Sequence, residues 1–252
     1  MPSESDAIIE VENLSAGYGD DVILKNLTFS VRRGEVFVIL GGSGCGKSTL
    51  LKHLIGLLPP ESGTIRINGE DFTAAVGDAR HEILRKFGVS YQSGALFGSM
   101  TLAENITLPI SEFTALPHAA RDAIAWMKLQ MVGLAGYMDH LPAEVSGGMQ
   151  KRAAIARAMA LDPRVLFLDE PSAGLDPVTS AELDALILRL REALGMTFVI
   201  VTHELPSIYA VADRVIMLDK ETKGIIAEGA PRKLRDESGN PFVRKFFRRE
   251  AE

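Results

Sequence analysis

A glycine-rich segment near residue 41 has the residue types of a phosphate-binding loop. Glycines let backbone N–H groups close around phosphate oxygens, and the N-terminus of a following helix adds partial positive charge. Lys47 can reach β- and γ-phosphates, and Ser48 offers a hydroxyl oxygen to Mg²⁺. An apolar stretch, 36–40, precedes the segment and an apolar helical pattern follows it, the strand–loop–helix context that disfavours a chance match. The expected nucleotide-binding residues are Gly41, Gly42, Ser43, Gly44, Cys45, Gly46, Lys47, Ser48 and Thr49.

A second glycine cluster, 146–150, has the sequence Ser-Gly-Gly-Met-Gln and contains no lysine. Ser146 suits the N-cap of a helix that continues through the alanine-rich stretch 151–161. Such a helix start can hold an anion, but it is poorly equipped to hold a nucleoside triphosphate alone. We therefore expect one nucleotide to need both glycine clusters.

Two adjacent carboxylates, Asp169 and Glu170, end an apolar stretch that begins at Val165. Successive residues of a strand point to opposite faces, so the two side chains are expected to take different directions and different tasks. One carboxylate would hold Mg²⁺, directly or through water, and the other would polarise an attacking water molecule. An ordinary polar strand end is the alternative, and the phosphate-binding segment upstream favours the catalytic interpretation.

Composition narrows the class of protein. The chain has 252 residues, of which 46% are hydrophobic and 24% are charged, which suits one large α/β domain or a core with an insert. The formal net charge of -6 does not favour binding to a polyanion, so we expect no nucleic-acid partner. Any anion must then be bound by local groups.

Three features bear on the compartment. Cys45 is the single cysteine, so no intrachain disulfide can form, and residues 1–6 are acidic where a signal peptide would be basic. The longest apolar runs have the length of buried strands, far below the roughly 18 residues that span a bilayer. We expect a cytoplasmic protein that does not itself cross the membrane.

The order of apolar segments predicts an α/β fold. Leu27, Phe29 and Val31 alternate with polar residues and predict an antiparallel flank over 8–31, with a turn at 17–20. Continuous apolar runs then predict strands of a parallel sheet that is covered on both faces. These runs are 36–40, 87–91, 165–168, 197–201 and 214–218.

Residues 92–161 lack the strand pattern and predict a helical insert. Asp176 is predicted to cap a later helix with Pro177 at its first position. The apolar face of one amphipathic helix is predicted from residues spaced by four and three positions, Ala120, Ile124, Met127, Met131 and Leu134.

The order of these motifs resembles that of a known family. The second glycine cluster precedes the carboxylate pair, and Pro-Ser-Ala-Gly-Leu-Asp at 171–176 follows it. Over nearly its whole length the chain resembles the ATPase subunits of ABC transporters, for which the Ser-Gly-Gly signature in this position is highly specific. The resemblance implies a P-loop NTPase core with a mostly parallel sheet, an antiparallel β flank and an inserted α-helical subdomain.

The same resemblance implies a domain organisation. We expect one ABC ATPase domain over 1–252. Its nucleotide-binding α/β core and flank would cover 1–91 and 162–227, its helical subdomain 92–161 and its C-terminal tail 228–252.

Roles for individual residues follow from the matching positions. The resemblance implies that Lys47 binds the phosphates of ATP and that Mg²⁺ lies among Ser48, Gln92 and Asp169. It implies that Glu170 is the general base. Taken alone, Gln92 would be an ordinary surface glutamine.

Three further positions match nucleotide contacts. His203 matches the switch histidine that senses the γ-phosphate, and Tyr18 matches an aromatic residue that stacks on adenine. Asp176, which ends the motif after the carboxylates, is counted among the nucleotide-binding residues. A structural histidine and a turn tyrosine packed on the flank are the alternatives for His203 and Tyr18.

The second glycine cluster gains a use from the resemblance. Ser146, Gly147 and Gly148 would contact the γ-phosphate of ATP bound by an opposite subunit, so that two chains enclose two ATP molecules head to tail. Two departures from the usual signature, Val145 and Met149, leave these three residues unchanged. At Cys45 an oxidation-prone thiolate beside Lys47 is one interpretation, and a small residue that merely fits is the favoured one.

The segment 92–105 narrows the resemblance to one branch. Gln-Ser-Gly-Ala-Leu-Phe at 92–97 and Met-Thr-Leu-Ala-Glu-Asn at 100–105 resemble the ATPases of Mla/Mce-type lipid transporters. That branch implies an integral-membrane permease, an MCE-type lipid-binding protein, a phospholipid or other hydrophobic substrate, and a place at the cytoplasmic face of the inner membrane. A permease helix would dock near 93–108, with contacts from Ala95, Leu96, Phe97, Met100 and Leu102, unless these residues belong to the core of the insert.

Other classes stay open. A soluble scaffold-type ABC ATPase, for example in iron–sulfur cluster assembly, would lack a permease. ABC ATPases of ribosomes or DNA repair usually have a second fused domain or long inserts, which this chain does not show. The C-terminal segment 240–252 has phenylalanine and arginine at helical spacing and would pack on its own domain, wrap another protomer or touch anionic lipid.

Overall fold

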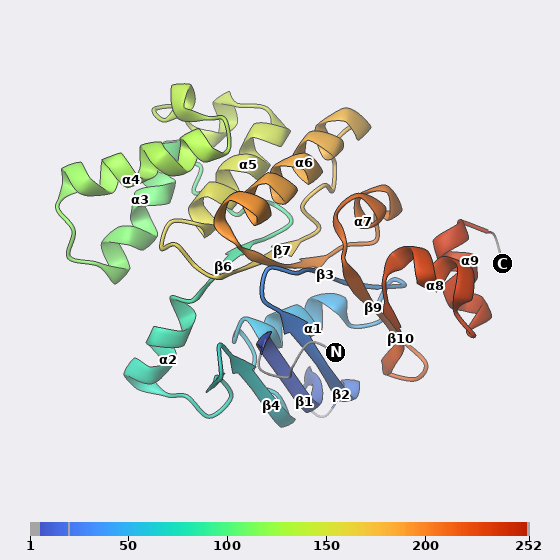
Figure 1. The fold of residues 1–252 in the computed structure, drawn as a ribbon. Coiled ribbons are helices and arrows are strands. Elements are labelled where there is room, and N and C mark those ends of the chain that lie inside the picture. The colour runs from blue at the N-terminus through green and yellow to red at the C-terminus, as the bar shows by residue number, and fades with distance from the viewer. Residues whose placement is uncertain (1–5, 20, 251–252) are drawn as a thin grey trace. The chain divides into compact units, whose positions relative to one another are not determined.

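The computed structural model describes residues 6–19 and 21–250, which divide into two compact units. The first unit combines Met1–Ile83 with Thr197–Glu252, and the second is Leu84–Met196. Residues 1–5 of the acidic N-terminal segment and Asp20 of the predicted turn lie outside the described residues. Figure 1 shows the elements of both units.

An antiparallel sheet forms one layer of the first unit (Figure 1). Its strands, in the order β2-β1-β4-β5, are β1 (Ala7–Tyr18), β2 (Asp21–Arg32), β4 (Ser62–Ile67) and β5 (Glu70–Asp71). In β2 the side chains of Leu27, Phe29 and Val31 are buried and those between them are not. The predicted antiparallel flank is confirmed.

A second sheet in this unit carries the parallel strands. β3 (Val36–Gly41) pairs in parallel with β8 (Thr197–Val201) on one side and β9 (Arg214–Asp219) on the other, while β10 (Gly224–Gly229) runs antiparallel to β9. Every residue of β3 and β8 is buried, as expected for strands covered on both faces. The predicted α/β class is confirmed.

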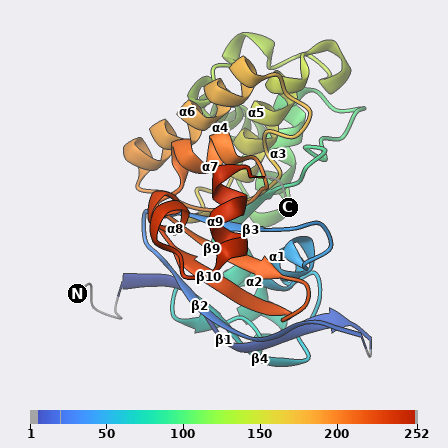
Figure 2. The ribbon, with the colours of Figure 1, turned by 90° about the vertical axis from the view of Figure 1, so that its right-hand side faces the viewer.

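Five helices of the first unit are α1 (Lys47–Leu54), α2 (Gly77–Leu84), α7 (Leu205–Val211), α8 (Pro231–Glu237) and α9 (Pro241–Arg248). The helical pattern that follows the phosphate segment forms α1, which ends at Leu54. Figure 2 shows α8 and α9 side by side.

The C-terminal helix α9 packs on its own unit. Val243 and Phe247 are buried, and the Tyr209 hydroxyl of α7 donates a hydrogen bond to the Phe247 carbonyl oxygen at 2.7 Å. The predicted packing of this segment is confirmed. Its contact with another protomer or with lipid stays a prediction.

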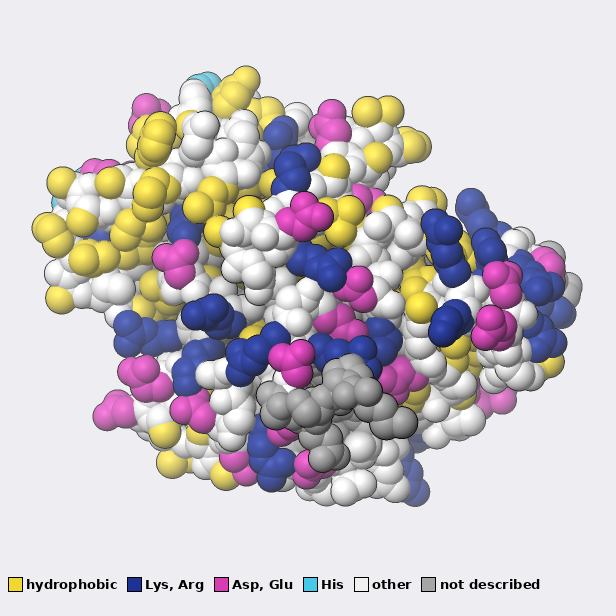
Figure 3. Space-filling model, viewed as in Figure 1, with side chains coloured by type: hydrophobic (Ala, Val, Ile, Leu, Met, Phe, Trp, Pro, Cys, Tyr) yellow, Lys and Arg dark blue, Asp and Glu magenta, His cyan; other side chains and the backbone are white. Residues whose placement is uncertain are grey.

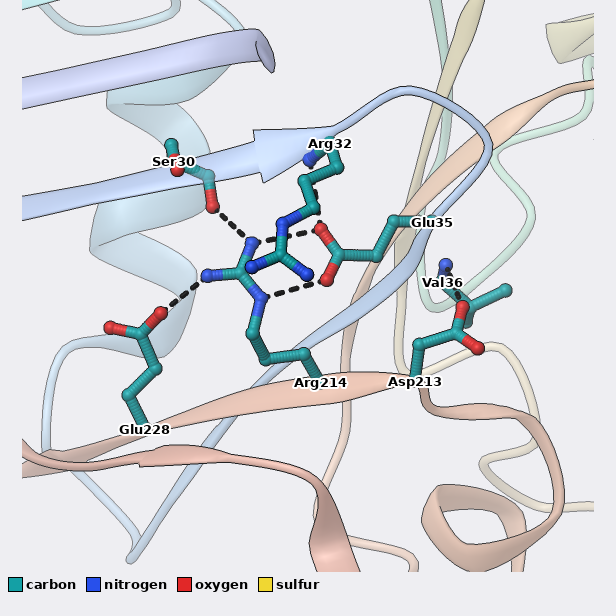
Figure 4. A network of polar contacts seen from close by, with 7 residues as sticks. All are labelled: Ser30, Arg32, Glu35, Val36, Asp213, Arg214 and Glu228. Carbon is teal, nitrogen blue, oxygen red and sulfur yellow. Dashed lines mark hydrogen bonds and ion pairs between the residues drawn. The ribbon is translucent and has the colours of Figure 1, made fainter. Parts of the chain in front are cut away.

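Arg214 ties four segments of the first unit together (Figure 4). Its guanidinium forms a bidentate ion pair with Glu35, with distances of 2.7 and 2.8 Å, and also pairs with Glu228 on β10. It donates a further hydrogen bond to the Ser30 carbonyl oxygen at 2.6 Å and lies 4.9 Å from the ring centre of Phe37. Since the side chains of Arg214 and Glu35 are only 12% and 5% exposed, these charges depend on each other for compensation.

The second unit contains a parallel strand pair and four long helices. The strands are β6 (Phe87–Ser90) and β7 (Val165–Asp169), and the helices are α3 (Leu102–Phe113), α4 (His118–Met131), α5 (Gly147–Ala158) and α6 (Pro177–Leu194). Short 3₁₀ turns cover Ala135–Tyr137 and Pro142–Glu144. Residues 92–161 contain no strand, as predicted. Among the described residues, no helix has the length and apolarity that a membrane crossing requires.

The predicted apolar face of α4 is wrong in part: Ala120 and Ile124 are half-buried, and Leu134 is buried but lies beyond the end of the helix. Met127 and Met131 are 45% and 39% exposed, and Figure 3 shows hydrophobic side chains on the surface over α4. The helix instead buries Ala125, Leu129 and the side chain of Lys128, whose ammonium lies 2.5 Å from Asp162. The buried lysine shifts the face that packs against the unit.

Candidate active site

The phosphate-binding segment forms a tight turn between β3 and α1. Gly41 has a φ of 150°, and a Cβ atom there would lie 2.4 Å from the Leu218 carbonyl oxygen. Gly46, with a φ of 100°, is the N-cap of α1 and makes no side-chain cap bond, so the first N–H groups of the helix face an anion-binding position. The Lys47 ammonium donates to the carbonyl oxygens of Gly41 and Gly42 at 2.8 and 3.0 Å.

Cys45 is a buried part of this turn. The residue is 2% exposed, and burial raises the pKa of its thiol even though Lys47 acts in the opposite direction. A raised pKa disfavours the thiolate that oxidation requires. The structure therefore supports the interpretation of Cys45 as a small packing residue.

Tyr18 lies beside the helix that follows the phosphate segment. The Lys52 ammonium of α1 lies 3.1 Å from the Tyr18 hydroxyl oxygen and 5.4 Å from the ring centre. Hydrogen bonds with Lys52 and Thr49 lower the pKa of Tyr18, and the residue is 46% exposed. An exposed ring held beside α1 can offer a face to a flat base.

His203 follows the carboxyl end of β8. Because β8 pairs in parallel with β3, the ends of the two strands lie at the same edge of the sheet, and the Thr202 N–H donates to the Ile39 carbonyl oxygen at 3.3 Å. The His203 side chain is 59% exposed, and its Nε2 lies 3.8 Å from a Glu204 carboxylate oxygen. The structure thus places His203 at the edge from which the phosphate segment leaves β3.

In the second unit, the two predicted helix caps are confirmed. The Ser146 hydroxyl accepts a hydrogen bond from the Met149 N–H at 3.3 Å at the start of α5. The Asp176 carboxylate accepts from the N–H groups of Val178 and Thr179, both at 3.0 Å, at the start of α6. Hydrogen bonds to Thr179 are the main reason that the pKa of Asp176 is lowered.

Gly148 links the two helix starts. A Cβ atom on Gly148 would lie 2.4 Å from Cγ2 of Thr179, whose hydroxyl is held by Asp176. A side chain larger than hydrogen fits at residue 148 only if one of the helices shifts or Thr179 rotates, and rotation would break the bond between the Thr179 hydroxyl and Asp176. Packing within this unit therefore favours glycine at residue 148.

The carboxylate pair lies at the carboxyl end of β7. Asp169 is the last residue of the strand, whereas Glu170 has a φ of 44° and lies outside it. The expected alternation of a strand therefore does not apply, because a left-handed backbone conformation sets the direction of the Glu170 side chain. Such a conformation is uncommon for a residue other than glycine and often occurs at functional sites.

A cavity of about 600 Å³ collects several of the expected residues. Gln92, Gly147 and Asp169 all line it, so the signature, the first carboxylate and the glutamine after β6 share one space within the second unit. Lys151 also lines this cavity, and its ammonium donates to the Gln92 carbonyl oxygen. Burial is the largest influence on Lys151 and lowers its pKa, while Asp169 and Glu170 act in the opposite direction.

These features agree with a comparison to known proteins. The family model described as "ABC transporter" matches residues 24–173, more than half of the chain. The chain belongs to the ABC transporter family. As the ATP-binding subunit of an ABC transporter it is an ATPase whose hydrolysis is coupled to transport.

Relatives support the assignment along nearly the whole chain. The intermembrane phospholipid transport system ATP-binding protein MlaF of Haemophilus influenzae is 41% identical over 227 residues, which are 90% of this chain and 85% of the relative. MlaF of Escherichia coli K12 is 38% identical over 95% of this chain and 88% of its own. The probable ribonucleotide transport ATP-binding protein mkl of Mycobacterium leprae is 43% identical over 95% of this chain and 68% of its own.

Solved structures confirm the ABC ATPase fold. CbiO1 from Clostridium perfringens, part of the ABC transporter complex cbiONQ, matches with a TM-score of 0.84 and 30% identity, covering 92% of each chain. A dimeric structure of the ATP-binding cassette MJ0796 bound to ADP and phosphate matches with a TM-score of 0.78 and 30% identity, covering 88% of this chain and 98% of that one.

The sequence motifs did not indicate two residues that the structure places at the site. Lys151 follows the signature without any motif of its own, and Thr179 is an ordinary helix residue until its packing against Gly148 is known. No periodicity or spacing marks either residue. Their contacts depend on segments that are distant in the chain.

We predict that Gly148→Ala lowers kcat for ATP about 100-fold, because the Cβ atom displaces the start of α5 and a displacement of about 1 Å at a site can cost that much. Steady-state phosphate release measures kcat, and equilibrium binding of a fluorescent ATP analogue should stay unchanged because the phosphate segment is untouched. Gly136→Ala is the control, since a Cβ atom there meets no atom within 4 Å. A kcat for Gly148→Ala equal to that of the control would contradict the packing argument.

Proposed function

We propose that this ABC ATPase drives an Mla/Mce-type transporter of phospholipid or another hydrophobic substrate. The observation that carries the proposal is the similarity to MlaF, which extends over at least 85% of both chains for the two relatives described. The mkl relative, named for ribonucleotide transport, covers this chain equally but leaves about a third of its own length unmatched. Transport of a ribonucleotide is therefore the second candidate.

The proposed functional unit is a head-to-tail dimer with two ATP molecules. The chain has one phosphate-binding turn with a lysine, at α1, and one lysine-free helix start, at α5. Each site would combine the turn of one protomer with Ser146, Gly147 and Gly148 of the other. The dimeric form of MJ0796 supports this arrangement by analogy.

Within each site, we propose the roles that the motifs imply. Lys47 binds the phosphates, and Tyr18 stacks on adenine. Glu170 takes a proton from the attacking water, and His203 contacts the γ-phosphate. Support comes from the turn geometry at α1, the exposed ring of Tyr18 beside this helix, and the uncommon backbone conformation of Glu170.

Mg²⁺ is the proposed metal cofactor. Ser48, Gln92 and Asp169 supply a hydroxyl, an amide and a carboxylate oxygen, the hard oxygen donors that Mg²⁺ prefers together with phosphate oxygens. Among the described residues there is no group of three or more His, Cys, Asp or Glu that could hold a metal alone, which fits an ion held mainly by the nucleotide. When bound, Mg²⁺ would neutralise charge on the β- and γ-phosphates.

An apolar groove supports a permease partner. A cavity of about 360 Å³ in the second unit is lined by Phe87, Val89, Leu108 and Phe113, with Arg157 and Glu112 among the charged residues. Phe97 lines it too and is 51% exposed. Of the other predicted contacts, Ala95 is exposed, Leu96 and Met100 are half-buried, and Leu102 is fully buried and belongs to the core.

The proposed cycle follows from these parts. ATP binding closes the dimer and hydrolysis reopens it, and the groove passes this movement to a permease segment that alternates between two states. The subunit would sit at the cytoplasmic face of the inner membrane, attached through the permease and working with an MCE-type lipid-binding protein. The permease contact separates this proposal from a soluble scaffold ATPase.

Affinity purification of the full chain from native membranes in mild detergent tests the proposal. We expect a multi-span membrane protein, an MCE-type protein and phospholipid, identified by mass spectrometry, and Phe97→Asp should lower recovery of the membrane protein about tenfold because it places a charge in the apolar groove. Val76→Asp is the control, since Val76 is 78% exposed and lies in the first unit. Recovery without any membrane protein would favour the scaffold class, and a bound ribonucleotide substrate would favour the second candidate.

A further inference from the structure

Residues 91–101 form the loop between β6 and α3. Its first half is bound to α5, the helix that begins at the Ser-Gly-Gly signature. The Lys151 ammonium donates to the Gln92 carbonyl oxygen. Two turns further along α5, the Arg157 guanidinium donates to the carbonyl oxygens of Gly94 and Ala95 at 3.0 and 2.7 Å. Two cations of one helix therefore hold three carbonyl oxygens of the loop backbone by charge-assisted hydrogen bonds, which are stronger than neutral ones.

Close packing adds to these hydrogen bonds. Gly94 is buried with a φ of 72°, and a Cβ atom on it would lie 3.5 Å from the Ala154 side chain of α5. The following residue, Ala95, has a φ of 48°. The loop backbone thus lies directly against α5, and the conformation of Ala95 is one that a residue other than glycine seldom adopts.

A side chain of α3 holds the second half of the loop. Asn105 is fully buried, and its side-chain oxygen accepts from the Phe97 N–H at 2.8 Å. The two N–H groups of its side chain are shared among the carbonyl oxygens of Phe97, Met100 and Thr101, which lie 3.0 to 3.1 Å from the nitrogen. A fully satisfied buried amide of this kind rigidifies the segment around it.

The loop contributes residues to two cavities of the second unit. Its start, at Gln92 and Ser93, lines the 600 Å³ cavity with Lys151 and Asp169. Its middle, at Phe97, lines the apolar groove with Arg157. The two cations that clamp the loop therefore each line one of the two spaces.

We propose that Lys151 is a positioning residue for ATP hydrolysis, which fixes the backbone at Gln92 against α5, while Arg157 and Asn105 hold the rest of loop 91–101. This inference rests on the proposed function for the role of Gln92. Lys151 itself acts through Gln92.

The test uses Lys151→Met, which removes the ammonium but keeps a long side chain, in the full chain with Mg²⁺ and ATP. We expect kcat to fall about tenfold, consistent with loss of one charge-assisted hydrogen bond, with the KM for ATP within about threefold of the wild type. Lys151→Arg should restore most of kcat. Hydrogen exchange should become about tenfold faster at residues 92–97 and stay unchanged in α6.

Arg152→Met is the matched control. It removes one cation from the next position of α5, but Arg152 donates to the Val132 carbonyl oxygen at 3.4 Å, away from the loop. Equal kcat and equal loop exchange in Lys151→Met and Arg152→Met would overturn the proposal. Faster loop exchange with unchanged kcat would overturn the positioning role alone, whereas absence of Mg²⁺-dependent hydrolysis in the wild type would overturn the proposed function, with loop exchange still reporting on the clamp.

Discussion

Glu170→Gln should abolish ATP turnover while ATP binding persists. The substitution keeps the size of the side chain and removes its ability to accept a proton, so kcat should fall by about 100-fold to 10,000-fold, the usual contribution of a general base. ATP would still bind, because the substitution leaves the phosphate-binding residues and the proposed Mg²⁺ ligands unchanged. The closed dimer should therefore accumulate in the presence of ATP.

Phosphate release and size-exclusion chromatography with ATP measure the two parts of this prediction. Glu144→Gln is a suitable control, because Glu144 is an exposed carboxylate of the same unit that caps a 3₁₀ turn. Near-wild-type turnover by Glu170→Gln would remove Glu170 from the role of base. Loss of turnover without accumulation of a dimer would contradict the proposed closure by ATP.

Arg214→Met should destabilise the protein by about 3–5 kcal/mol, the usual cost of leaving a buried charge without its partner. The Glu35 carboxylate is 5% exposed and accepts from the Arg32 N–H at 2.8 Å, so it would stay in place without its cation. Adding Glu35→Gln removes that charge and keeps an oxygen for Arg32. The double variant should therefore regain a large part of the lost free energy of unfolding.

Urea unfolding followed by circular dichroism measures these free energies. Arg66→Met is the control, because Arg66 pairs with Glu12 at 3.1 Å while their side chains are 34% and 53% exposed, and a surface pair contributes at most about 1 kcal/mol. Equal losses for Arg214→Met and Arg66→Met would show that burial of the network adds nothing. The double variant must be more stable than Arg214→Met if the uncompensated carboxylate is the cause.

The strands and helix caps were predictable because their causes are local. The run 36–40 contains only apolar residues and forms the buried strand β3, and Asp176 and Ser146 cap helices through bonds to residues two or three positions ahead. Period and capping chemistry depend on neighbours in the chain, so the sequence contains the needed information.

The predictions that did not hold also have specific physical causes. The face of α4 was misplaced because lysine counts as polar in a periodicity argument, whereas Lys128 is buried and paired with Asp162, more than thirty residues away. The strand alternation assumed at Glu170 does not apply, because β7 ends at Asp169 and Glu170 has a left-handed backbone conformation. Neither a distant ion pair nor a single left-handed residue leaves a signal in the spacing of apolar residues.

The sequence by itself determined the chemistry that this protein can perform. The lysine-bearing turn, the lysine-free signature and the carboxylate pair are contiguous motifs, and their order was enough to indicate the family. Only the tertiary structure decided which side chains support them. Arg214 gathers partners from residues 30 to 228, Thr179 sets the size limit at Gly148, and Lys151 holds Gln92, because each contact is made by folding distant segments together.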